Sequence, residues 1–240
     1  PPPYSESPSS AFYKEANEVY QVSNKATQEQ RQVALYWADD PLKTPTPAGH
    51  WVYIANDLLK QQKADLAQAA QTLVRLNLAM ADAFIAGWKT KYTVSLLRPV
   101  TYVQLVIDSN WVPGLMHTPP FPEFPSGHSV QSSAAAVVLG QAFGVNTAFT
   151  DNTHNDRGWG PRNFKSFDLA ADEAGLSRLY AGIHYRGAIV GGQAQGRCVA
   201  GKVLALVKSL HQRPRSRLVP LPDYAEEFCA LVPFAQGGLM

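Results

Sequence analysis

The sequence has few of the features that indicate a membrane protein, a nucleic-acid-binding protein or a disulfide-rich scaffold. No apolar run reaches the roughly 18 residues that a membrane-spanning helix needs. The 21 Lys and Arg residues nearly balance the 19 Asp and Glu residues, and no long basic run occurs. We therefore expect neither nucleic acid nor a membrane as a partner. The hydrophobic fraction of 45% and the charged fraction of 17% over 240 residues are typical of a globular protein with a full core.

Cysteine is scarce as well, with Cys198 and Cys229 as its two occurrences. The two residues could form one disulfide, which the sequence alone does not show. Cys198 lies in an apolar helical stretch, so we expect it to be a buried free thiol. The N-terminal sequence Pro1-Pro2-Pro3-Tyr4 has neither a start Met nor an apolar leader, and we expect a mature, processed or truncated chain.

Strand patterns are also scarce, whereas apolar residues recur at helical spacing through most of the chain. This pattern predicts an all-α fold, a helical bundle of six to eight helices that forms a single domain over residues 1–240. Residues 1–8 and 212–240 are expected to be peripheral, and residues 144–165 are expected to form a long surface loop. Helices are expected at about 10–20, 27–37, 49–60, 64–90, 129–143, 168–183, 188–210 and 222–231.

Three short motifs contain the residues that could carry chemistry: Lys91 to Pro99, Pro125-Ser126-Gly127-His128, and Ser177-Arg178 with His184. Each motif alone has an ordinary structural explanation, as exposed charges on a helix, a helix cap or a structural histidine. Together they place three cations, Lys91, Arg98 and Arg178, in apolar surroundings with few carboxylates nearby. Because buried charges need a partner, a bound polyoxyanion would satisfy all three.

The second motif supplies directional donors for such an anion. Ser126 and Gly127 stand at the expected start of a helix, where backbone N–H groups are free and the helix dipole favours negative charge. Gly127 also permits close approach of the backbone. Arginine offers a planar fork that matches a tetrahedral oxyanion, whereas lysine acts as a point charge. The sequence therefore predicts a binding site for a tetrahedral oxyanion.

The order Lys-x6-Arg-Pro, Pro-Ser-Gly-His and Ser-Arg-x5-His resembles the signature of the vanadium-dependent haloperoxidases and the type 2 phosphatidic acid phosphatase superfamily. Three flanking features resemble the haloperoxidase branch more closely. They are the segment Pro119 to Phe124, the segment Ala48-Gly49-His50-Trp51, and Trp88 shortly before Lys91. The similarity runs from about Phe12 to Val207.

The resemblance implies a role for each matching residue and vanadate as the cofactor, with phosphate as an alternative occupant. His184 would be the vanadium ligand, or the nucleophile of a phosphatase, and His128 would be the acid–base group. Trp88 and Phe121 would tune the choice of halide. The residues expected to bind the oxygens of vanadate are Lys91, Arg98, Ser126, Gly127 and Arg178.

The activity implied is peroxidase chemistry, in which hydrogen peroxide oxidises a halide to a hypohalous-acid equivalent that halogenates a small organic acceptor. A secreted or periplasmic location follows from the same resemblance. Two alternatives stay open: an acid phosphatase at the same site, and an inactive anion-binding relative.

The sequence departs from the family pattern in two places. Ala188 stands where the family usually carries Asp, four residues after the last His, which argues against the phosphatase and could weaken cofactor binding. Fewer residues precede Lys91 than in family haloperoxidases. We therefore expect a compact member or a fragment, forming a homodimer or larger homo-oligomer.

Other candidate sites have weaker support. His50, His117 and His154 do not fit a zinc spacing pattern. Asp151, Asn152 and Asp156 resemble part of a calcium loop, but no Glu closes it at the required distance. Asp39 or Asp40 is expected to pair with one of the site arginines.

Overall fold

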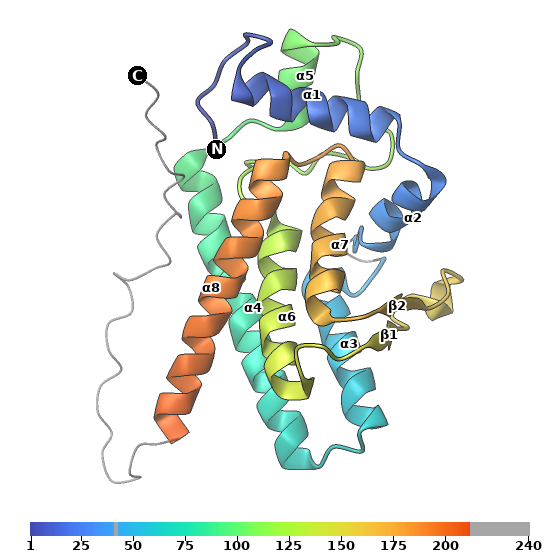
Figure 1. Cartoon of the computed structure of the whole chain (residues 1–240), viewed down its shortest axis with the longest axis vertical. Helices are drawn as coiled ribbons and strands as arrows, with labels where there is room; N and C mark the ends of the chain where they lie inside the picture. Colours follow the sequence, from blue (N-terminus) through green and yellow to red (C-terminus); the bar gives the residue numbers. More distant parts are fainter. Residues whose placement is uncertain (41–42, 212–240) are drawn as a thin grey trace.

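The computed structural model describes residues 1–40 and 43–211, which form α-helices and one short hairpin (Figure 1). The predicted all-α bundle is confirmed, and none of the helices in these ranges is long and apolar enough to cross a membrane. The extent of the domain stays a prediction, and the helix expected at 222–231 lies outside the described residues. The helices are α1 (Ala11–Asn24), α2 (Gln28–Tyr36), α3 (Thr46–Gln61), α4 (Leu66–Val94), α5 (Pro99–Val106), α6 (Gly127–Phe143), α7 (Phe167–Tyr180) and α8 (Arg186–His211).

Several helices begin at side chains that cap their free N–H groups. The Ser10 hydroxyl accepts a hydrogen bond from the backbone N–H of Tyr13 and begins α1. Thr27 begins α2 and Asp65 begins α4, each in a reciprocal capping box with the glutamine three residues later. Caps of this kind are typically worth about 1 kcal/mol, so these boundaries are specified locally by the sequence.

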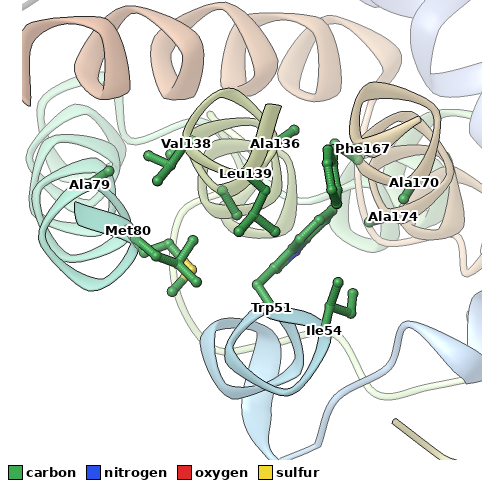
Figure 2. Packing of buried hydrophobic residues seen from close by; sticks show 14 of the residues in the cluster. Trp51, Ile54, Ala79, Met80, Ala136, Val138, Leu139, Phe167, Ala170 and Ala174 are labelled. Atoms are coloured by element: carbon green, nitrogen blue, oxygen red, sulfur yellow. The ribbon is translucent and has the colours of Figure 1, made fainter. Parts of the chain in front are cut away.

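Helix α6 lies at the centre of the bundle and contacts α3, α4, α7 and α8. It is rich in small residues, and most of its side chains are buried. Figure 2 shows Leu139 of α6 between Met80, Trp51 and Phe167, which come from α4, α3 and α7. The close approach of α8 depends on Gly196, where a Cβ atom would overlap the carbonyl oxygen of Val130.

Three secondary-structure predictions need correction. Residues 144–165 are not only loop, because Phe149–Asp151 (β1) and Arg162–Phe164 (β2) pair in an antiparallel hairpin around the 3₁₀ turn Asn155–Arg157 (η1). Strands of three residues are too short to show a period of two. Helix α5 was not predicted; its first residue is Pro99, and proline is well tolerated at the first helical position. Helix α3 also has a proline in its first turn, Pro47, and begins at Thr46, earlier than expected.

The prediction of a buried free thiol at Cys198 is wrong. Cys198 is exposed on α8 and is disulfide-bonded. The apolar character of the surrounding helix suggested burial, but α8 turns this position away from α6. Cys229, the other cysteine of the sequence, lies outside the described residues.

Four long helices bring their ends together at one end of the bundle. Helices α4 and α7 end, and helices α6 and α8 begin, at the upper end in Figure 1, beneath α1 and α5. All three sequence motifs lie at these helix ends. The fold therefore brings together residues that are far apart in the sequence.

Candidate oxyanion site

His184, in the turn between α7 and α8, has hydrogen-bond partners on both ring nitrogens. Its Nε2 lies 3.2 Å from Nη1 of Arg98, and its Nδ1 lies 2.8 Å from Oε1 of Glu123. The same carboxylate oxygen accepts a hydrogen bond of 2.8 Å from the backbone N–H of Tyr185. Burial raises the pKa of Glu123 to about 8. When Glu123 is ionised it accepts a hydrogen bond from Nδ1–H, and the arrangement selects the tautomer with a lone pair on Nε2.

Arg98, the N-cap residue of α5, is held in place by backbone carbonyl groups. Its Nε donates to the carbonyl of Phe121 at 2.8 Å, and its Nη1 donates to the carbonyl of Ile183 at 2.9 Å. Its Nη2 is buried and has no hydrogen-bond partner. The guanidinium group is thus fixed on one side and has an N–H group available on the other.

Arg178, in the last turn of α7, occupies the other side of the site. Its Nη1 donates to the carbonyl of Trp37 at 2.7 Å and lies 3.0 Å from Nε2 of His128. Its Nη2 contacts the sulfur of Met116 at 2.7 Å, whereas its Nε is buried without a partner. Like Arg98, it is a positioned cation with an unused donor.

Lys91, near the end of α4, is completely buried. Its ammonium donates to the carbonyls of Pro122, Glu123 and Pro125 at 2.9, 3.0 and 2.6 Å. These bonds use all three N–H groups, so Lys91 fixes the 122–125 segment and contributes positive charge at longer range.

Two aromatic rings and a helix N-terminus complete the site. The Lys91 ammonium lies 5.6 Å from the ring centroid of Trp88 and 5.2 Å from that of Phe121. The Arg98 guanidinium lies 4.9 Å from the Phe121 ring. Ser126 caps α6, and a Cβ atom at Gly127 would lie 3.2 Å from the Trp88 ring. All nine predicted site residues therefore lie at one end of the bundle.

The site is strongly electropositive. Burial, together with Arg98, Lys91, Arg178 and His128, holds the pKa of His184 well below its usual value. Burial and the Arg178 guanidinium lower the pKa of His128 to about 3. Burial also lowers the pKa of both Arg98 and Arg178 to about 10. Both histidines are consequently neutral at neutral pH and can accept a proton or a metal ion at Nε2.

The residues present fit a tetrahedral oxyanion. Positioned arginines with free N–H groups suit anionic oxygens, and the neutral His184 Nε2 suits a vanadium atom. A bound polyanion would also offset the mutual repulsion of the buried cations.

Glu123 is the functional residue that the sequence analysis missed, although it noted the segment that contains it. The contact with His184 joins positions that are 61 residues apart, and one sequence cannot reveal it. Asp39 lies close enough to oppose the lowering of the pKa of Arg178. Its carboxylate, however, bonds to His50, with Nδ1 to oxygen distances of 3.1 and 3.0 Å.

Comparisons with known proteins agree with this geometry. The family model of the VCPO second helical-bundle domain matches residues 103–213. A bacterial vanadium-dependent iodoperoxidase matches with a TM-score of 0.81 and 46% identity, covering 85% of this chain and 52% of that chain. No curated protein sequence matches the chain.

Two more distant structures share the fold. A holo-type bacterial vanadium-dependent chloroperoxidase has a TM-score of 0.69 and 17% identity, covering 87% of this chain and 51% of that chain. A transmembrane PAP2-type phosphatidylglycerolphosphate phosphatase from Bacillus subtilis has a TM-score of 0.51 and 15% identity, covering 88% of this chain and 92% of that chain. The chain spans about half the length of the haloperoxidases that it matches. The chain therefore matches the VCPO second helical-bundle domain over residues 103–213 and, over 85% of its length, resembles a vanadium-dependent iodoperoxidase in sequence and fold.

Proposed function

We propose that this protein is a vanadium-dependent haloperoxidase that uses hydrogen peroxide to oxidise a halide. The observation that carries the proposal is the convergence of two buried arginines, each with an unused N–H group, on neutral histidines. Vanadate bound there would supply Lewis-acid activation of hydrogen peroxide toward a halide. The oxidised halide would then halogenate a small organic acceptor.

Each residue of the proposed site has a separate role in binding or orienting the anion. His184 offers the Nε2 lone pair as the ligand, and Glu123 holds its ring in the required tautomer. The free N–H groups of Arg98 and Arg178, with the Ser126 hydroxyl and the Gly127 N–H, would bind the anionic oxygens. Lys91 adds charge, because its own donors are already used.

His128 is suited to move a proton. Its ring is neutral, and Nε2 lies 3.0 Å from the Arg178 guanidinium. It can take a proton from hydrogen peroxide at Nε2, and Arg178 opposes its retention, so the proton is readily released. Trp88 and Phe121 lie against Lys91 and Arg98 and would line that side of the site with apolar surface.

The direct test is reconstitution with orthovanadate followed by a halogenation assay with a phenol indicator and hydrogen peroxide. Iodide should be tested first, because the 46% identical structure is an iodoperoxidase, and bromide and chloride next. Vanadate-dependent turnover with at least one halide is expected. Confirmed vanadate binding without turnover on any halide would rule the proposal out.

An acid phosphatase is the second candidate. Ala188 argues against it, since the family Asp that would orient His184 is missing. The Glu123 carboxylate, 2.8 Å from Nδ1 of His184, could supply the same orientation. Hydrolysis of a chromogenic phosphomonoester, inhibited by vanadate, would favour this activity. Binding of both anions without either reaction would indicate an anion-binding relative.

A further inference from the structure

A second cluster of buried ionisable side chains adjoins the oxyanion site. It contains Asp39 from the segment after α2, His50 from α3, and His154 from the turn after β1. These residues are 1%, 0% and 2% exposed. One donor atom from each lies within 4.8 Å of the other two. The proposed haloperoxidase chemistry leaves this cluster without a role.

The spacing of the donor atoms suits a small divalent metal ion. Nδ1 of His50 lies 3.0 Å from Oδ2 of Asp39, and Nε2 of His154 lies 3.4 Å from Oδ1 of the same carboxylate. Ligands placed about 2.0–2.2 Å from a tetrahedral zinc ion are themselves separated by roughly 3.3–3.6 Å. Two of the three donor separations are therefore close to those around a zinc ion, and the third, between His50 and His154, is within 4.8 Å.

His154 is the observation that points to a ligand. Both of its ring nitrogens are buried and neither has a hydrogen-bond partner. Its Nε2 lies 3.4 Å from Oδ1 of Asp39 without meeting hydrogen-bond geometry. A buried imidazole without partners is costly, and such groups in folded proteins require an explanation. Metal coordination would provide it.

His50 has the partner that a metal-binding histidine usually has. Its Nε2 lies 2.7 Å from Oδ2 of Asp151, and the other oxygen of Asp151 accepts a hydrogen bond from the backbone N–H of Thr153. A carboxylate behind the ring fixes the tautomer and directs the opposite nitrogen toward a metal. A proton on His50, shared by Asp39 and Asp151, would also satisfy these three groups, but it would leave His154 unsatisfied.

Asp39 adopts a conformation that needs support from its surroundings. Its φ of 49° lies in the left-handed region, which is uncommon for a residue other than glycine. The carbonyl of Trp37, two residues earlier, accepts the hydrogen bond from Arg178. A ligand that fixes Asp39 would therefore also fix the segment that positions Arg178.

We propose that Asp39, His50 and His154 bind one Zn²⁺ ion, with a water molecule as the fourth ligand and Asp151 orienting His50. Two imidazole nitrogens and one carboxylate oxygen are a common donor set for zinc. The charge of the ion would balance the two carboxylates while His50 remains neutral. Trp37, stacked on His50 with ring centroids 4.4 Å apart, and Tyr36 cover the site.

The test measures zinc in the full chain, expressed in zinc-supplemented medium and purified without chelators or an affinity tag. Vanadate is left out, so the result does not depend on the proposed peroxidase function. Wild type is compared with His154→Ala and with His117→Ala, whose histidine is exposed and lies outside the cluster. We expect about one zinc ion per chain in wild type and in His117→Ala, and loss of the metal in His154→Ala. Asp151→Asn should weaken binding about 10- to 100-fold.

Equal zinc content in wild type and a folded His154→Ala variant would overturn the proposal. If that variant does not fold, the wild-type protein is refolded with Co²⁺ and its visible absorption spectrum tests the proposal. Intense visible absorption bands, which tetrahedral Co²⁺ gives, are expected, and their absence would overturn the proposal. Failure of this test would leave the oxyanion site untouched.

Discussion

In the proposed site, Glu123 is the carboxylate that contacts His184, where the family pattern would use Asp at position 188. Glu123 is completely buried, and one of its oxygens accepts hydrogen bonds from both His184 and the backbone of Tyr185. In the family pattern, an Asp at the position of Ala188 orients the histidine. That position follows His184 in the sequence, whereas Glu123 precedes it. We therefore infer that Glu123 is a positioning residue that acts through His184.

The variant Glu123→Ala should lower vanadate affinity about 10- to 100-fold, because His184 loses both its orientation and the carboxylate that makes Nε2 more basic. Removal of a negative charge near the anion acts in the opposite direction but over a longer distance, so we expect it to be the smaller effect. Isothermal titration with orthovanadate measures the result. Glu15→Ala is the control, because Glu15 is a partly buried carboxylate near Gly187 rather than His184. Unchanged or tighter binding in Glu123→Ala would show that His184 needs no orienting carboxylate.

Arg178 provides the second test at the scale of one side chain. Arg178→Ala should lower vanadate affinity about 10- to 100-fold or more, since hydrogen bonds to charged groups contribute about 1.5–3 kcal/mol each. Arg178→Lys keeps the charge but loses the planar fork. Its vanadate affinity should lie between that of wild type and that of Arg178→Ala. The control is Arg186→Ala, because Arg186 is exposed and pairs with Glu18. Binding by a folded Arg178→Ala variant at wild-type affinity would contradict the proposed arrangement.

At the scale of the elements, helix α8 depends on the absence of side chains where it crosses α6. Gly196→Ala should destabilise the protein by about 1–3 kcal/mol or more, because the added methyl group overlaps the Val130 carbonyl in a packed core. Gly201→Ala in the same helix has no atom within 4 Å of the added group. It should be neutral or stabilising by up to about 1 kcal/mol. Urea unfolding of both variants measures the difference, and equal stabilities would contradict the described packing of α6 and α8.

Most helices could be predicted from the sequence because their signals are local. The caps at Ser10, Thr27 and Asp65 lie next to the residues they serve, and the apolar repeat of α4 needs no partner to be recognised. Helix α5 and the hairpin were missed, since eight residues and two strands of three residues carry little periodicity.

The candidate site was only partly predictable. Lys91, Arg98 and Arg178 stood out because charges are unusual in apolar segments. The contacts of Glu123 with His184 and of Arg178 with the Trp37 carbonyl join distant positions, and only the folded chain reveals them. The roles of the nine predicted residues, the partners, the location and self-association stay predictions.

At the scale of the whole molecule, the electropositive site should couple anion binding to stability. A ligand at about 100 times its dissociation constant stabilises the folded state by about 2.7 kcal/mol. For a chain of this size that corresponds to a rise in Tm of roughly 5–10 °C. Differential scanning fluorimetry measures this rise in Tm. Samples with vanadate or phosphate are compared with a sample in chloride at equal ionic strength. Equal melting temperatures in all three salts would indicate that the buried cations do not bind an oxyanion.

The central claim is that Arg98, Arg178 and His184 hold one tetrahedral oxyanion between them. A crystal structure of the protein soaked with orthovanadate tests it most directly, with anomalous scattering to locate vanadium. The account predicts one vanadium peak within bonding distance of Nε2 of His184, with its oxygens contacting the free N–H groups of both arginines. A vanadium peak elsewhere, or side chains of Arg98 and Arg178 turned away from His184 with no anion between them, would contradict it.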